Sequence, residues 1–351
     1  MLLVLVLCGV MWGIGAMMGA PKSQRAIMVG ALLSGVILVQ VVLPDGHPLR
    51  EATGGSPALW LLIAGFVVLG MGYGRVIRIL RQRAEATSAP EPAAPATGFS
   101  DTELNRYARH IVLRELGGAG QKRLKSARVL VIGAGGLGAP VLQYLAAAGV
   151  GTIGVIDDDV VDNANLQRQV IHRDADIGIP KVFSAEAAMK AQNPYVKVRP
   201  YNRRLSDDIA SDLFDDYDLI LDGTDNFESR YLSNRVAATK GKPLISGALS
   251  QWEGQVSVFH PKEGGPCYQC IFPEAPADRL APSCAEAGVV GPLPGVVGSI
   301  MALEAVKWLS GAGMVLRGEM LIYDGLYGET RKIGLKKRVD CPVCAGTGLS
   351  S

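Results

Sequence analysis

A glycine-rich turn within residues 129–140, VLVIGAGGLGAP, carries the first pattern with a chemical meaning. Gly133, Gly135 and Gly138 satisfy the spacing G-x-G-x-x-G, and Asp157 ends the next apolar run. In a strand–turn–helix unit such glycines let the backbone approach phosphates at the amino end of the helix, and the acid binds ribose hydroxyls. Taken alone, the pattern also fits a nicotinamide dinucleotide.

Two cations and a second carboxylate change this interpretation. Arg168 lies in DNANLQRQV, Lys181 ends DIGIPK, and Asp225 ends YDLILDGTD. Cations clamp phosphate oxygens, and a carboxylate at the end of a strand suits Mg²⁺. Hydride transfer needs neither cation, so the set favours ATP with Mg²⁺ over an NAD-dependent oxidoreductase. Considered singly, the two cations would be surface charges and the carboxylate a helix cap.

Four of the six cysteines form two C-x-x-C pairs, Cys267 with Cys270 and Cys341 with Cys344. Four thiolates in such pairs suit a tetrahedral zinc ion that is ligated only by protein and is therefore structural. The gap between the pairs exceeds the common zinc-ribbon spacing. A redox-active C-x-x-C is the alternative, and it predicts reactivity without metal.

Alternating elements must position these residues from about Phe99 onward. Strands are expected at ARVLVIGAG, GTIGVID, VKVRPYN, YDLILDGTD and PLISGA, with helices over 139–148 and 181–192. This alternation predicts an α/β fold with a Rossmann-like, mostly parallel sheet. The ATP-binding glycine loop belongs to this sheet, and the zinc-bound subregion lies towards the carboxyl terminus.

The first 80 residues predict a membrane anchor. Three apolar stretches, 1–20, 26–43 and 58–74, each have about the length that crosses ~30 Å of hydrocarbon as a helix. We therefore expect about three transmembrane helices that contact membrane lipid. Buried helices of a soluble domain are one alternative, and a cleaved signal peptide is another for the first stretch.

Positive charge predicts the orientation of this anchor. Lys22 and Arg25 separate the first two stretches, and four arginines follow residue 74. The positive-inside rule places both regions on the cytoplasmic side. A multi-pass location in the inner (cytoplasmic) membrane follows, with an Ala/Pro-rich linker at 81–98 and a catalytic domain at 99–351 in the cytoplasm. The near balance of 35 Lys and Arg with 33 Asp and Glu gives no reason to expect nucleic acid.

Residues 100–347 resemble the MoeB/ThiF/HesA family of adenylyltransferases, which are bacterial relatives of ubiquitin-activating enzymes. The matching stretches, in family order, are RYARHIVL, GAGGLGAP, IDDDVVDNANLQRQ, GIPK, DGTDN, SGALSQWEGQVSVF, CYQC, SCAEAGVVGPLPGVVGSIMALEAVKWL and CPVC. The resemblance implies ATP-dependent adenylation of the carboxyl-terminal glycine of a small ubiquitin-like sulfur carrier for molybdopterin or thiamine synthesis. A sulfur donor is a further candidate partner. Residues 1–98 lie outside the resemblance, and the usual members are soluble.

The resemblance also implies roles for single residues. Gly136 lies against the nucleotide and Asp157 holds the ribose, while Asn165, Arg168 and Lys181 contact the phosphates. Asp225 binds Mg²⁺. The full nucleotide-binding set is Gly133, Gly135, Gly136, Gly138, Asp157, Asn165, Leu166, Arg168, Gln169, Lys181, Asp225 and Asn226. The resemblance further supports zinc at the four cysteines.

The catalytic candidates are Arg168, Lys181 and Asp225 together with two residues outside the nucleotide set. Arg109, in RYARH, matches an arginine that reaches into the partner subunit's site, which implies a homodimer. A surface salt bridge is the alternative, and Arg106 could exchange roles with it. Cys284 matches a cysteine that forms a thioester or acyl disulfide in some relatives, and a passive role is the alternative.

Two other functions fit the same superfamily. A tRNA-modifying dehydratase also uses ATP, but it would need a strongly basic face. A non-catalytic membrane docking module would need a broken ATP site, whereas the matched nucleotide residues are all present.

Overall fold

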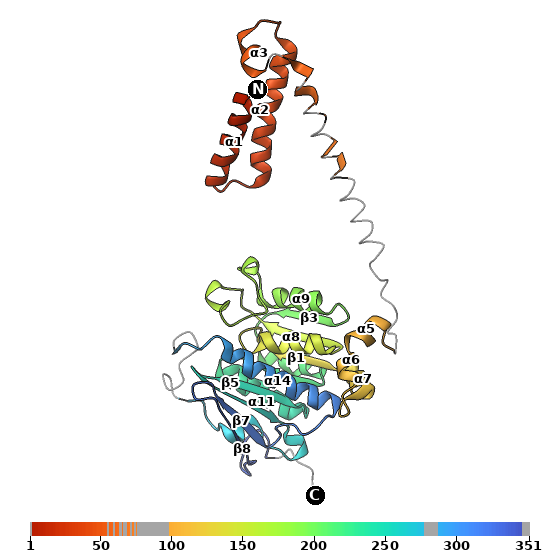
Figure 1. The fold of residues 1–351 in the computed structure, drawn as a ribbon. Coiled ribbons are helices and arrows are strands. Elements are labelled where there is room, and N and C mark those ends of the chain that lie inside the picture. The colour runs from red at the N-terminus through yellow and green to blue at the C-terminus, as the bar shows by residue number, and fades with distance from the viewer. Residues whose placement is uncertain are drawn as a thin grey trace. The chain divides into compact units, whose positions relative to one another are not determined.

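The computed structural model describes residues 2–54, scattered positions between 56 and 75, and residues 98–276 and 287–345 (Figure 1). The chain divides into two compact units, Met1–Thr97 and Gly98–Ser351. The third predicted membrane helix, 58–74, is described only at scattered positions. Nearly all of the predicted linker, and Cys284, lie outside the described residues.

The amino-terminal unit contains helices α1 (Leu2–Met17), α2 (Lys22–Val42) and α3 (Pro48–Thr53). Helices α1 and α2 lie side by side (Figure 1), and Val4, Val36 and Trp60 form a small apolar cluster. Many other apolar side chains of these helices are exposed.

Two described helices have the length and apolar character of a membrane span. One is Gln24–Val42 in α2, with a mean hydropathy of 2.1, and the other is Pro292–Ser310, with a mean hydropathy of 1.2. The second belongs to the core of the other unit. Since core helices of soluble proteins and signal sequences share these properties, the three-helix anchor stays a prediction.

The unit Gly98–Ser351 is built on an eight-stranded sheet with the order β3-β2-β1-β4-β5-β6-β7-β8. Its strands are β1 (Arg128–Ile132), β2 (Thr152–Asp157), β3 (Lys197–Asn202), β4 (Leu219–Asp222), β5 (Leu244–Leu249), β6 (Glu253–Phe259), β7 (Glu319–Asp324) and β8 (Glu329–Gly334). The five predicted strands correspond to β1 through β5, and their parallel pairing is confirmed. The α/β fold class is therefore correct.

The sheet as a whole is mixed, which corrects the prediction of a mostly parallel sheet. Strands β6, β7 and β8 pair in antiparallel fashion. The turn at 250–252 joins β5 to β6, and the turn at 325–328 joins β7 to β8. Such short connections allow only antiparallel neighbours, because a parallel pair needs a long crossover.

Helices cover both faces of the sheet. The helices of this unit are α5 (Asp101–Arg106), α6 (Ala108–Ile111), α7 (Gly117–Ser126), α8 (Gly138–Ala148), α9 (Lys181–Gln192), α10 (Asp207–Asp215), α11 (Phe227–Lys240), α12 (Tyr268–Ile271) and α14 (Pro292–Ser310). Helices α8, α9 and α14 share one apolar core with the sheet, and α10, α11 and α12 share a second core. The predicted helices at 139–148 and 181–192 are confirmed as α8 and α9.

The strand order explains where a ligand can bind. Strand β1 pairs with β2 on one side and with β4 on the other, so the strand order runs through β2 and β3 in one direction and through β4 and β5 in the other. Open α/β sheets bind ligands in the crevice at the carboxyl ends of the strands beside such a switch point. The glycine loop follows β1 and the segment 223–226 follows β4, so both border this crevice.

Candidate active site

A cavity of about 550 Å³ opens at the carboxyl ends of β1, β2, β4 and β5. The structure brings many of the predicted site residues into its wall. These are Gly133, Gly135, Gly136, Asp157, Arg168, Gln169, Lys181, Asp225 and Asn226. Gly138, Asn165 and Leu166 are not among its lining residues.

The glycine loop needs two of its glycines for backbone reasons. Gly133 has a φ of 92°, which favours glycine, and its amide donates to the carbonyl of Ile156 over 2.9 Å. At Gly138 a Cβ atom would overlap the carbonyl oxygen of Gly133. Gly138 therefore serves the close approach of α8 to the loop and does not face the ligand.

Asp157 accepts a hydrogen bond from the glycine loop. One carboxylate oxygen accepts from the amide of Ala134 over 2.7 Å, and the other accepts from the amide of Asp159 over 2.8 Å. Burial raises the pKa of Asp157 above its ordinary value, although these two amides oppose the shift. Each oxygen keeps a lone pair that a ribose hydroxyl can use.

Lys181 and Arg168 line the same cavity as the loop, and each is held by a neighbour. The amine of Lys181, only 4% exposed, pairs with the carboxylate of Asp159 over 2.7 Å. Arg168 donates from Nη2 to Oδ1 of Asn165 over 2.8 Å and from Nη1 to the carbonyl of Ala164 over 3.1 Å. Asn165 thus holds the guanidinium from outside the cavity.

A buried histidine that was not among the predicted site residues contacts the glycine loop. His172 contacts the carbonyl of Ala134 through Nε2 over 2.9 Å and the hydroxyl of Ser184 through Nδ1 over 2.8 Å. Burial lowers the pKa of His172. No motif marks this residue, because its contact with the loop exists only in the folded chain.

The segment after β4 presents Asp225 to solvent at the cavity. Oδ1 of Asp222 accepts from the amide and the hydroxyl of Thr224, over 2.9 and 2.7 Å, which fixes the turn. Asn226 caps α11 by accepting from the amide of Ser229 over 2.9 Å. Asp225 is exposed and has no ion pair among the described residues, so its carboxylate can serve a cation.

Among the other polar side chains that line the cavity, five are large and come from segments after β3 and β4, from β6 and from α12. They are Arg203, Arg204, Arg230, Gln255 and Tyr268. Arg204 pairs with Glu228 over 2.6 Å. Arg230 lies in the first turn of α11, five residues after Asp225. The only sequence signal for it is this short distance from the predicted strand end at Asp225.

Arg109 does not line the cavity of its own chain. It is exposed in the short helix α6 and has no ion pair in the described part of the chain. Arg106 is occupied instead, because it donates to the carbonyl of Gln192 over 2.6 Å and lies 5.8 Å from the ring centre of Tyr195.

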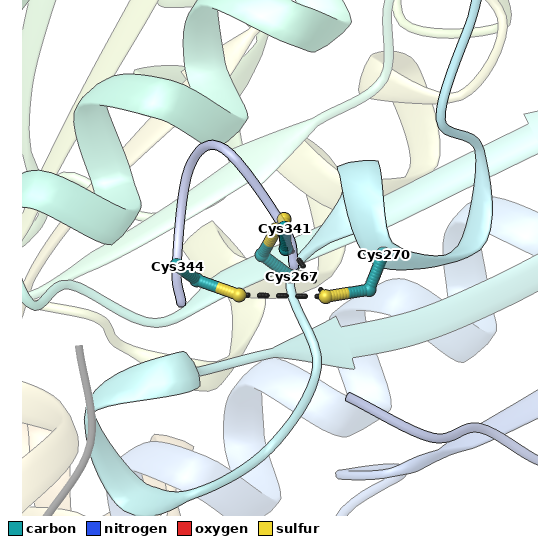
Figure 2. Close-up of side chains that lie close together, drawn as sticks. All are labelled: Cys267, Cys270, Cys341 and Cys344. Carbon is teal, nitrogen blue, oxygen red and sulfur yellow. Dashed lines mark hydrogen bonds between the residues drawn. The ribbon is translucent and has the colours of Figure 1, made fainter. Parts of the chain in front are cut away.

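The four predicted cysteines form a buried cluster away from the cavity (Figure 2). Sulfur atoms are 3.9 Å apart between Cys267 and Cys270, 3.6 Å between Cys267 and Cys341, and 3.4 Å between Cys270 and Cys344. Four sulfurs at about 2.3 Å from a tetrahedral zinc ion lie about 3.8 Å from one another. The cluster therefore fits zinc.

Neighbouring donors stabilise thiolates in this cluster. The side-chain amide of Asn234 donates to Cys267 over 3.7 Å, and the backbone amide of Arg338 donates to Cys270 over 3.4 Å. Such donors are typical of the groups that surround the ligands of a metal. The shortest separation joins cysteines of different C-x-x-C pairs, which favours one shared ion over two separate redox dithiols.

Comparisons with known proteins agree with this geometry. The sequence profile of the ThiF family matches residues 107–343. The sulfur carrier protein adenylyltransferase of Thermus thermophilus is 50% identical over 250 residues, which cover 70% of this chain and 92% of that protein. The probable adenylyltransferase/sulfurtransferase MoeZ of Mycobacterium tuberculosis is 51% identical over 260 residues, covering 73% of this chain and 66% of MoeZ. Mouse adenylyltransferase and sulfurtransferase MOCS3 is 47% identical over 256 residues, covering 73% of this chain and 55% of MOCS3.

Solved structures share the fold at lower identity. A crystal structure of PaaA has a TM-score of 0.60 and 23% identity, and the match covers 76% of this chain and 83% of PaaA. Escherichia coli MccB with ATP has a TM-score of 0.59 and 22% identity, covering 69% of this chain and 75% of MccB. The expected resemblance is thus confirmed at the level of the family: the chain belongs to the ThiF family.

Proposed function

We propose that this protein uses ATP to adenylate the carboxyl-terminal glycine of a small ubiquitin-like sulfur carrier, releasing pyrophosphate. The observation that carries this proposal is the shared cavity. It joins a glycine loop, the acid Asp157, the cations Arg168 and Lys181, and the exposed carboxylate of Asp225. The Thermus relative, half identical over nearly its whole length, is named for activity on a sulfur carrier.

Different residues of the cavity would bind the ribose, the phosphates and the Mg²⁺ ion of ATP. Asp157 accepts hydrogen bonds from the ribose, and backbone amides of the glycine loop approach the phosphates at the start of α8. Arg168 and Lys181 lie beside the loop, where they can clamp phosphate oxygens. Asp225 would hold Mg²⁺ with the phosphates, and the ion would neutralise charge on the departing pyrophosphate.

The reaction is an exchange at the α-phosphorus. A carboxylate oxygen of the carrier forms a bond to phosphorus, and the bond between that phosphorus and the oxygen bridging to the β-phosphate breaks. The bridging oxygen leaves with the electron pair as part of pyrophosphate. Negative charge grows on the phosphate oxygens during this step, and Arg168 and Lys181 stabilise it. The product is a mixed anhydride, which a sulfur nucleophile attacks more readily than a carboxylate.

We propose further that the four cysteines hold a structural zinc ion. All four ligands come from protein, so the ion has no open position for a substrate. It would fix the segment around Cys341 and Cys344 to helix α12, which carries the cavity residue Tyr268.

The oligomer and the location are also proposals. The exposed position of Arg109, outside its own cavity, supports a homodimer in which this residue enters the partner's site. Exposed apolar side chains on α1 and α2, including Leu7, Val10 and Trp12, support contact with membrane lipid. The charges Lys22 and Arg25 support the cytoplasmic membrane with the catalytic unit inside the cell.

The direct test is ATP–pyrophosphate exchange by the full chain with each Gly-Gly-ending carrier of the same genome. We expect exchange that depends on one carrier and on Mg²⁺, and that disappears in Asp225→Ala. A tight ATP complex with no exchange for any carrier would refute the proposed function. It would direct attention to RNA substrates or to a docking role.

A further inference from the structure

Arg230 is a buried cation that forms no ion pair with any carboxylate of the described residues. It is 6% exposed, yet it lines the cavity. Its guanidinium donates to the carbonyl of Thr224 and, over 3.3 Å, to the hydroxyl of Ser246. No carboxylate lies within ion-pair distance of it in the described part of the chain. The buried Asp222, whose Oδ2 has no hydrogen-bond partner, does not pair with it either.

Burying an arginine in this way is costly unless an anion or several acceptors compensate it. Neutral oxygens of Thr224 and Ser246, together with the neighbouring hydroxyl of Tyr268, compensate only part of the charge. Since a guanidinium has five N–H donors in a planar fork, further donors remain for a ligand in the cavity. The placement therefore indicates an anion that arrives with a substrate.

A small recess shares Arg230 with the cavity. It has a volume of about 10 Å³, and its wall combines the polar residues Arg230, Ser246, Gln255, Ser257 and Tyr268 with the apolar residues Ala248, Phe259, Phe272 and Met320. Ser246 lies opposite Ser257 across β5 and β6, and Gln255 lies opposite Ala248. The recess holds about one water-sized group, which is the size of a single carboxylate oxygen.

Two anions meet in the proposed reaction, the triphosphate and the carboxylate of the acceptor. Arg168 and Lys181 come from the segments after β2, beside the glycine loop, and suit the triphosphate. Arg230 comes from α11 and donates to Ser246 in β5, on the side of the cavity that Ala248 and Leu249 at the carboxyl end of β5 line. We infer that Arg230, with the recess beside it, binds the terminal carboxylate of the acceptor protein. This inference rests on the proposed function.

Binding of this kind would orient the nucleophile. One carboxylate oxygen bonds to the guanidinium, and the second oxygen remains free to attack the α-phosphorus. Removing the guanidinium should weaken acceptor binding about 10- to 100-fold, the range for a charge-assisted hydrogen bond. ATP binding should change little.

The test compares Arg230→Gln, Arg230→Lys and Arg235→Gln in the full chain. Arg235 lies on the same helix but forms an exposed ion pair with Asp207, so its variant is the matched control. The acceptor is a Gly-Gly carrier that supports exchange with the unaltered protein. We expect Arg230→Gln to raise the KM for this carrier with little change in the Kd for ATP. Arg230→Lys should have a smaller effect, and Arg235→Gln none.

A second measurement separates a carboxylate site from a structural role. Calorimetry with a non-hydrolysable ATP analogue gives the Kd of the carrier and of its carboxyl-terminal amide. If Arg230 binds the carboxylate, the amide and Arg230→Gln each weaken binding, and together they weaken it no further. Additive losses, or an equal loss of ATP affinity with a lower melting temperature, would overturn the inference. Absence of exchange in the unaltered protein would instead refute the proposed function.

Discussion

Asn165 offers a sharp test of how the phosphate site is built. The family resemblance implies that this residue contacts the phosphates, whereas in the structure it lies outside the cavity wall and accepts from Arg168 over 2.8 Å. We therefore expect Asn165→Ala to act only through the guanidinium. A hydrogen bond to a charged group contributes about 1.5–3 kcal/mol, and the half-buried position favours the lower end. A loss of about 1.5 kcal/mol corresponds to a roughly 10-fold lower kcat/KM.

Arg168→Ala should cost much more, because it removes the cation itself. Loss of one preorganised donor from a charged transition state costs about 2.7–4 kcal/mol, or roughly 100- to 1,000-fold. The assay is carrier-dependent ATP–pyrophosphate exchange, which reports formation of the acyl-adenylate. Asn163→Ala is the matched control, since Asn163 lies exposed on the same short helical turn and outside the cavity wall.

The double variant decides between the two roles of Asn165. If Asn165 acts through Arg168, adding Asn165→Ala to Arg168→Ala has no further effect on kcat/KM. A further 10-fold loss in the double variant would mean that Asn165 contacts the nucleotide directly. An unchanged kcat/KM in the single variant would mean that the hydrogen bond does not hold the guanidinium in the reacting complex.

Three further predictions concern the loop, the metal and pH. Gly138→Ala should abolish ATP binding in calorimetry, because its Cβ overlaps the carbonyl of Gly133, whereas Gly118→Ala, in an open helical position, should not weaken it. Metal analysis should find one zinc ion per chain, and Cys344→Ser should lower both the zinc content and the melting temperature. Burial lowers the pKa of His172, so the folded chain favours the neutral imidazole, and its stability should fall as the pH drops below about 6.5. Melting temperatures at a pH of about 7.5 and about 5.5 should differ less for His172→Gln; an equal difference would exclude this histidine as the cause.

The sequence was sufficient for the parallel half of the fold. Strands β1 through β5 are short apolar runs that alternate with helices, and such runs are typical of strands buried on both faces. The antiparallel half was harder to predict. Strand β8, ETRKIG, is exposed along its whole length and has no alternation of apolar and polar residues, so only its pairing with β7 defines it.

The same distinction applies to the site. Asp157, Arg168, Lys181 and Asp225 stand at recognisable places, namely strand ends and the segments that follow them. Arg230 and His172 have no such mark, because contacts with other elements of the fold place them: Ser246 in β5 for the arginine and Ala134 in the glycine loop for the histidine. A residue that acts through tertiary contacts can be identified only once those contacts are known.

Helices α2 and α14 show why hydropathy alone does not determine environment. Both are apolar enough to cross a membrane, but 50% of the α14 segment is buried within the protein, against 11% of the α2 segment. The sheet is shaped to receive α14, because Gly247 and Gly254 leave room for Met301 and Val297. The described part of the amino-terminal unit offers α2 no comparable surface. The apolar residues of α14 are therefore explained by its own domain, whereas most of the α2 segment is not covered by the described residues, and this difference is the observation behind the proposed contact with membrane lipid.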